Sequence, residues 1–209
     1  MILNMVREKE QRNMDNYIVH FCKKIKEVGI KNTLIGLWRR EKLGRICSKY
    51  GLHPWLKSPY ELRLYAQMAA ESVNELAGID CVVEVGCGLG EIIRHINVPK
   101  KYGYDIDSHV IEVAKAITPR ESNIEYFVGE LRDVDVSNAD VLLTIGWMHA
   151  VSYDDLKTAY HECIEKNKFR YVVVDVKIME DRKRDFSVFH PVMNVFQGRN
   201  TLLWNQRFG

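Results

Sequence analysis

The chain has 209 residues, of which 46% are hydrophobic and 28% charged, a composition typical of a globular protein with a sizeable core. No apolar run reaches the roughly eighteen residues of a membrane span, and the charged start MILNMVREKEQ argues against a signal peptide, so we expect a cytoplasmic protein. Five widely spaced cysteines without a C-x-x-C pair argue against a disulfide framework and a zinc site.

Charge is distributed unevenly along the chain. The formal net charge is only +2, yet residues 1–57 hold 13 Lys and Arg against 5 Asp and Glu, while the remainder holds 17 against 23. This asymmetry indicates a basic segment that meets an anionic partner. A solvated helical face is the alternative that the sequence leaves open.

The first predicted elements are helices. Apolar residues at helical spacing predict a mostly helical segment over residues 5–50 with a break near Gly29, and a further helix over 61–76. The stretch GLHPWLKSPY between them contains two prolines and predicts a turn region. We therefore expect a helical N-terminal extension or lid of residues 1–60, followed by a domain of residues 61–209.

From Cys81 onward, short β-rich runs alternate with helical stretches. This alternation predicts an α/β fold with a doubly wound, mostly parallel sheet. The tail is expected to add an antiparallel C-terminal strand or hairpin. The predicted strands are 81–85, 102–106, 124–128, 140–145 and 171–176, and the predicted helices between them are 91–96, 108–117 and 153–167.

A glycine-rich loop follows the first predicted strand. Its spacing is E-x-G-x-G-x-G, formed by Glu84, Gly86, Gly88 and Gly90. Glycine allows unusual backbone angles and lets a ligand approach the backbone closely. The dinucleotide fingerprint G-x-G-x-x-G would need a third glycine at position 91, where an acid, Glu91, is unfavourable beside a pyrophosphate.

The loop and the segments after it resemble the class I S-adenosylmethionine-dependent methyltransferases, whose sheet is Rossmann-like. In that family an acid at the end of the second strand binds the ribose hydroxyls, and Asp105 lies there, 19 residues after Gly86. The turn after the third strand contacts the adenine, and the end of the fourth strand lies beside the donor methyl. The resemblance implies S-adenosylmethionine as cofactor, bound by Glu84, Gly86, Cys87, Gly88, Gly90, Asp105, Ile106, Glu130, Leu131 and Gly146. Glu84 has an alternative role as a cap for loop amides.

The acceptor side is less well defined by the sequence. His149, a few residues after the fourth strand, is the candidate general base, with a packed structural histidine as the alternative. Trp147 and His190 are candidates for the acceptor pocket, and Tyr60 for a covering lid. The paired acids of magnesium-dependent catechol-type enzymes are not evident, so we expect no metal.

These observations predict an enzyme that moves the methyl group of S-adenosylmethionine to an oxygen, in preference to a nitrogen, of a small anionic acceptor. A phosphorylated or nucleotide-linked sugar or a capsule precursor fits this description, and the chain is weakly similar to methyltransferases of bacterial capsule and surface-glycan pathways. Alternatives left open are an RNA methyltransferase, a non-catalytic nucleoside- or RNA-binding module, and a nicotinamide dehydrogenase. A homodimer also remains open.

Overall fold

A computed structural model describes the backbone of residues 2–147, 152–176, 192–197 and 204–205, and side-chain environments within 18–147 and 152–174 except Tyr153. The chain separates into two compact units, Met1–Leu64 and Tyr65–Gly209, and each is described by itself. Among the described residues, no helix is long and apolar enough to cross a membrane.

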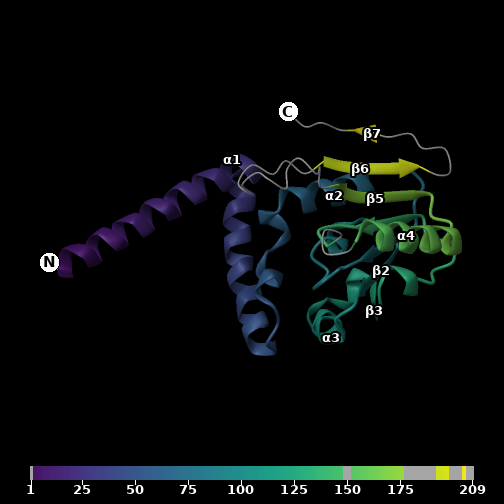
Figure 1. Cartoon of the computed structure of the whole chain (residues 1–209), viewed down its shortest axis with the longest axis horizontal. Helices are drawn as coiled ribbons and strands as arrows, with labels where there is room; N and C mark the ends of the chain where they lie inside the picture. The colour runs from purple at the N-terminus through teal and green to yellow at the C-terminus, as the bar shows by residue number, and fades with distance from the viewer. Residues whose placement is uncertain (1, 148–151, 177–191, 198–203, 206–209) are drawn as a thin grey trace. The chain divides into compact units, whose positions relative to one another are not determined.

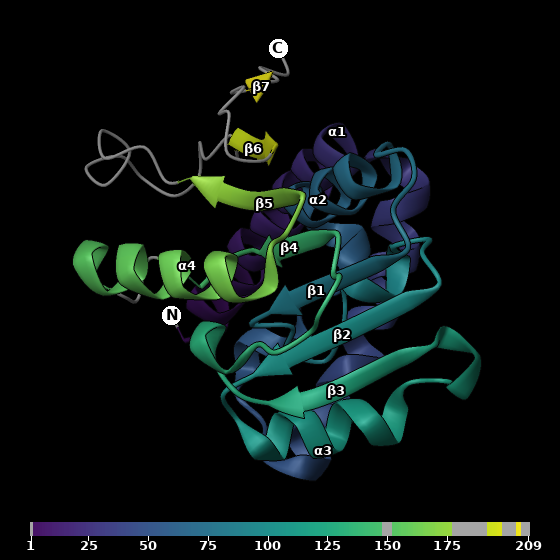
Figure 2. The ribbon, with the colours of Figure 1, turned by 90° about the vertical axis from the view of Figure 1, so that its right-hand side faces the viewer.

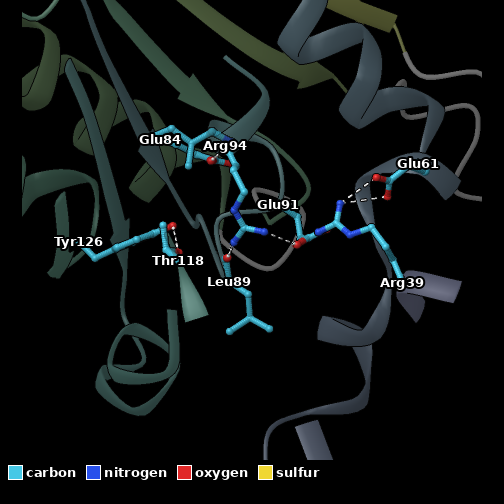
Figure 3. A network of polar contacts seen from close by, with 9 residues as sticks. Arg39, Glu61, Glu84, Leu89, Glu91, Arg94, Thr118 and Tyr126 are labelled. Carbon is cyan, nitrogen blue, oxygen red and sulfur yellow. Dashed lines mark hydrogen bonds and ion pairs between the residues drawn. The ribbon is translucent and has the colours of Figure 1, made fainter. Parts of the chain in front are cut away.

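The first unit is built on one long helix, α1 (Ile2–Tyr50), which changes direction within its length (Figure 1). The change is at Gly29, whose φ of 82° and ψ of 159° are non-helical. The 3-10 helices η1 (Pro54–Lys57) and η2 (Tyr60–Leu62) follow. Helix α1 packs against η2 at Gly36, because a Cβ there would lie 2.5 Å from the Cγ of Leu62. Arg39 donates to both carboxylate oxygens of Glu61 at 2.8 and 3.1 Å (Figure 3).

The second unit contains a sheet in the order β3-β2-β1-β4-β5-β6-β7. Strands β1 to β5 are parallel, and their arrows point the same way in Figure 2. Strand β6 pairs with β5 in antiparallel register, Tyr171 opposite Gln197, and β7 pairs with β6. The strands are β1 (Cys81–Val85), β2 (Lys100–Asp105), β3 (Ile124–Val128), β4 (Val141–Thr144), β5 (Tyr171–Val176), β6 (Val192–Gln197) and β7 (Trp204–Asn205).

Both faces of the central strands are covered. On one face, Val83 and Val85 of β1 pack with Ala159 and Cys163 of a helix in one apolar cluster. On the other face, Val82 is also fully buried, as expected for a parallel sheet between helices. The helices of this unit are α2 (Leu64–Asn74), η3 (Ile93–His95), α3 (Ser108–Ile117), η4 (Arg120–Ser122), η5 (Leu131–Asp133) and α4 (Tyr153–Asn167).

The parallel strands and their covering helices confirm the predicted α/β, Rossmann-like fold class. The expected helix over residues 91–96 is wrong, because only the 3-10 turn η3 forms there. The segment before Pro99 is too short for a stable α-helix, and the backbone N–H of Ile93 donates to the Glu84 carboxylate at 3.0 Å instead. The glycine loop therefore leads into a turn and not into a helix N-terminus.

Candidate functional site

The candidate site lies at the carboxyl ends of the parallel strands. Strand β1 is flanked by β2 on one side and β4 on the other, so the strand order reverses between β1 and β4. Ligands of open α/β sheets bind at such a reversal, beyond the carboxyl ends of the strands. The glycine loop that follows Val85 lies at this point.

The backbone of the glycine loop is held by hydrogen bonds to the neighbouring strand β2. The N–H groups of Gly86 and Cys87 both donate to the carbonyl of Tyr104, at 2.8 and 2.9 Å. The N–H of Gly88 donates to Oδ2 of Asp105 at 2.9 Å. These three amides therefore have acceptors within the protein.

Two of the loop glycines are required by protein side chains. Gly86 has a φ of 76°, and a Cβ there would lie 2.2 Å from Cδ1 of Trp147. Gly90 has a φ of 75°, and a Cβ there would lie 2.1 Å from the hydroxyl of Tyr126. The Trp147 indole N–H also donates to the Val85 carbonyl at 2.7 Å, which fixes the ring over the end of β1. Packing inside the protein therefore accounts for the absence of side chains at both positions.

Tyr126, the one buried residue of β3, is not among the site residues predicted from the sequence. Its hydroxyl lies 3.0 Å from the Thr118 hydroxyl (Figure 3). A signal was present in Gly103, since glycine inside a strand often marks a close approach. A Cβ at Gly103 would lie 2.9 Å from the Tyr126 ring and 3.0 Å from the Cys87 sulfur.

Two buried carboxylates meet the loop from strands β1 and β2. Glu84 is 2% exposed and Asp105 is 9% exposed. Asp105 accepts from the N–H groups of Gly88 and Asp107, the latter at 3.1 Å. Because a carboxylate offers about four lone-pair sites, Asp105 retains capacity for two further donors. These two carboxylates therefore give the loop a negative electrostatic potential.

Cys87 is not a nucleophile in this site. Burial, with the charges of Glu84 and Asp105 beside it, raises the pKa of the Cys87 thiol well above its ordinary value. The thiol is therefore protonated at neutral pH, whereas nucleophilic attack needs the thiolate. Cys87 fills the space that Gly103 leaves under the loop.

The expected conflict between Glu91 and a pyrophosphate takes a different form in the structure. Glu91 is buried, and its Oε1 lies 3.1 Å from Nη1 of Arg94, which also donates to the Leu89 carbonyl at 2.8 Å (Figure 3). Its charge is thus compensated within the protein. A pyrophosphate is disfavoured instead by the two other carboxylates and by the lack of a long helix after the loop.

The predicted adenine-contacting turn follows β3. The N–H of Gly129 donates to the Asp105 carbonyl at 3.0 Å, which places this turn beside the second strand. Glu130 is exposed and pairs with Arg132 at 3.4 Å, while Leu131 is buried in the apolar cluster. Ile106, after Asp105, is 76% exposed. Ile106 and Glu130 are accessible to a ligand, whereas the side chain of Leu131 is not.

The end of β4 brings Gly146 and Trp147 to the same edge. Gly146 has a φ of 84°, and no atom of the described residues lies within 4 Å of a Cβ built on it. Just before it, the hydroxyls of Thr144 and Tyr160 are hydrogen-bonded. His149 and His190 lie outside the described residues, and Tyr60 belongs to the first unit.

The two carboxylates beside the glycine loop fit S-adenosylmethionine. That molecule carries a cationic ammonium, a cationic sulfonium and a ribose diol, and each of these is favoured by nearby carboxylates. Among the described residues, no group of three or more His, Cys, Asp and Glu side chains is arranged to bind a metal ion.

Comparisons with known proteins identify a matching domain family and similar folds. Residues 82–183 match the family described as methyltransferase domain, and no curated protein matches the sequence. The methyltransferase domain of bacterial CtHen1-C is 20% identical over 60% of this chain and 72% of its own, with a TM-score of 0.50. CalS10, an amino pentose methyltransferase from Micromonospora echinaspora, is 14% identical over 64% and 61%, with a TM-score of 0.49.

At 20% identity the CtHen1-C structure shows the fold alone, and the family match supplies the activity. Its 82–183 range contains the glycine loop, Asp105 and the end of β4. Residues 82–183 therefore form a class I S-adenosylmethionine-dependent methyltransferase domain, with S-adenosylmethionine as its cofactor.

Proposed function

We propose that the protein transfers the methyl group of S-adenosylmethionine to an oxygen of a small anionic acceptor, such as a phosphorylated or nucleotide-linked sugar. The observation that carries the donor side is the convergence of the buried Glu84 and Asp105 carboxylates on the glycine loop. The support for an anionic acceptor is the excess of 13 basic over 5 acidic residues in 1–57.

On the donor side, Asp105 accepts hydrogen bonds from the ribose hydroxyls with the lone pairs that Gly88 and Asp107 do not use. Glu84 holds the loop by accepting from Ile93 and favours the cationic amino-acid end of the donor. The bound donor supplies a methyl group on a positively charged sulfur, which is already activated for displacement. The protein's main contribution is thus to position donor and acceptor.

On the acceptor side, Trp147 forms a wall next to Gly86, fixed by its hydrogen bond to Val85. His149, two residues further along, is proposed to remove the proton of the attacking hydroxyl. Replacing it, His149→Ala, should leave donor affinity unchanged and lower turnover by about a hundredfold or more, the usual contribution of a general base.

The donor site is tested by calorimetric titration with S-adenosylhomocysteine, with NADH as the control ligand. We expect micromolar binding of the first and no heat with the second. Asp105→Ala should weaken binding about tenfold or more, since hydrogen bonds to a charged group contribute roughly 1.5–3 kcal/mol.

A matched control is available at the opposite edge of the sheet. The Asp140 carboxylate also accepts from two backbone N–H groups, those of Asp80 and Cys81, at 2.8 and 3.1 Å, but at the amino ends of the strands. Asp140→Ala should therefore lower stability without altering affinity. Equal losses of affinity in the Asp105 and Asp140 variants would show that destabilisation, and not ligand contact, is being measured.

The acceptor class is tested separately, by methyl transfer to matched pairs of sugars with and without a phosphate. Transfer to the phosphorylated member alone supports the proposal. Transfer to an RNA oligonucleotide, with none to either sugar series, would replace the small acceptor by RNA. Tight donor binding with no transfer to any acceptor would favour the non-catalytic alternative.

A further inference from the structure

Helix α1 carries an exposed apolar stripe after its break at Gly29. The stripe consists of Ile30, Leu34, Leu37 and Trp38, which are 61%, 55%, 41% and 64% exposed. Their spacing of four, seven and eight residues from Ile30 places them on one face of the helix. Single exposed apolar residues are common, but four on one face indicate an interaction site.

The opposite face of the same helix already packs within the first unit. Its residues are buried and recur at helical spacing; they are Thr33, Gly36, Leu43 and Cys47. This face contacts η2 through Gly36 and Leu62. The helix is therefore apolar on two faces, and only one of them is covered by its own unit.

A basic ridge runs beside the apolar stripe. Its members are all exposed and are Lys31, Lys42, Arg45 and Lys49. The ammonium of Lys42 lies 5.7 Å from the ring centre of Trp38, which joins the ridge to the stripe. The one acid between them, Glu41, is paired with Arg45 at 2.6 Å. That pair offsets the charge of Arg45, and the three lysines keep the ridge positively charged.

We propose that the stripe and the ridge together dock the protein on an anionic lipid surface. In this arrangement the helix lies in the plane of the interface, with the stripe among the acyl chains and the ridge at the headgroup phosphates. A helix with Trp, Leu and Ile on one face and basic residues beside them has the composition of an interfacial helix. The docking surface uses no residue of the donor site, but its basic residues belong to the same excess of charge in 1–57 that supports an anionic acceptor. Flotation and methyl transfer therefore test the two proposals separately.

Two other occupants fit less well. In a second copy packed on the stripe, the ridge would meet its own positive charges, with Glu41 already paired. For RNA, three of the four stripe residues are aliphatic and offer bases no ring to stack on. A bilayer surface supplies both the apolar phase and the negative charge.

The test is flotation of the full-length protein with two kinds of vesicle, phosphatidylcholine alone and phosphatidylcholine with about a third phosphatidylglycerol, at about 0.1 M salt. Three variants accompany the wild type: Leu34→Glu with Trp38→Glu for the stripe, Lys31→Glu with Lys42→Glu for the ridge, and Arg40→Glu as the control. Arg40 is exposed and follows Gly36 by four residues, on a side of the helix away from the ridge. Circular dichroism of each variant verifies that the helix is retained.

We expect flotation with the anionic vesicles, little with phosphatidylcholine alone, and losses of about tenfold or more in both the stripe and the ridge variants. The control should stay within about twofold of wild type. Absence of flotation overturns the proposal. So does a concentration-dependent dimer that the stripe variant abolishes, or RNA binding that the ridge variant abolishes, if neither is accompanied by flotation.

Discussion

At the scale of single residues, the contact between Gly90 and Tyr126 determines how the loop packs. Gly90→Ala forces a φ of 75° on an L-residue and places its Cβ 2.1 Å from the phenol oxygen. We expect a loss of about 3 kcal/mol in the free energy of unfolding, from backbone strain and overpacking together.

Removal of that oxygen separates the two causes. Tyr126→Phe alone should lose about 1 kcal/mol, for the hydrogen bond to Thr118. Combined with Gly90→Ala, it should lose less than the sum of the two single variants, because the clash is relieved while the strain stays. Urea denaturation of all four proteins measures this coupling, and strict additivity would contradict the contact.

The phenol of Tyr126 also predicts a pH dependence. Burial raises the pKa of Tyr126 to about 12, against about 10 in an unfolded chain. The neutral phenol is favoured in the folded state, so its contribution is complete below pH 10 and is lost as the pH rises toward 12. This amounts to about 2–3 kcal/mol. The fall in melting temperature over this range should be smaller in Tyr126→Phe, and identical curves would refute the shift.

At the scale of elements, the packing of α1 on η2 depends on a small residue. Gly36→Ala improves helix propensity by about 1 kcal/mol, yet its Cβ would lie 2.5 Å from Cγ of Leu62. We expect a net loss of stability in the wild-type background. In a Leu62→Ala background the same substitution should become neutral or stabilising, and a loss in both backgrounds would exclude the clash as its cause.

Elements with a strong periodic pattern were predictable from the sequence. The predicted strands 81–85, 124–128 and 171–176 match β1, β3 and β5, and the predicted helices 108–117 and 153–167 match α3 and α4. Ser152 is the N-cap of α4, and its hydroxyl accepts from the N–H of Asp155 at 3.3 Å. Here the local pattern and the tertiary packing favour the same structure.

The segment after the glycine loop was not predictable, because contacts distant in sequence determine it. The Glu84 carboxylate binds the N–H of Ile93, nine residues later, which is beyond the spacing of contacts within one turn of a helix. Similarly, the positions of Trp147 and Tyr126 against the loop depend on strand order, which places β4 and β3 near β1 only in the folded sheet. The local periodicity of apolar residues does not predict such contacts.

At the scale of the whole molecule, the reactivity of the five thiols measures how well the cysteines of both units are protected from solvent. Cys22 is exposed, while the other four are buried: Cys47, Cys81, Cys87 and Cys163. Burial raises the pKa of Cys81 and of Cys163 to about 11. An aromatic disulfide reagent at neutral pH should therefore react rapidly with about one thiol per folded chain and with all five after denaturation.

The variant Cys22→Ser should abolish the rapid reaction. If a thiol still reacted rapidly in that variant, one of the units would have to open in the native state, contrary to the burial described above. Because Cys47 lies in the first unit and the other three in the second, replacing Cys47 would then identify which unit opens.

The fit of Trp147 and Tyr126 against Gly86 and Gly90 has a consequence for evolution. A descendant that no longer bound the donor would still need glycine at both positions in order to fold, because the indole and the phenol occupy the space of a side chain. Selection for folding and selection for catalysis would thus preserve the same two glycines. The same holds in part for Asp105, because its carboxylate also accepts from the N–H groups of Gly88 and Asp107.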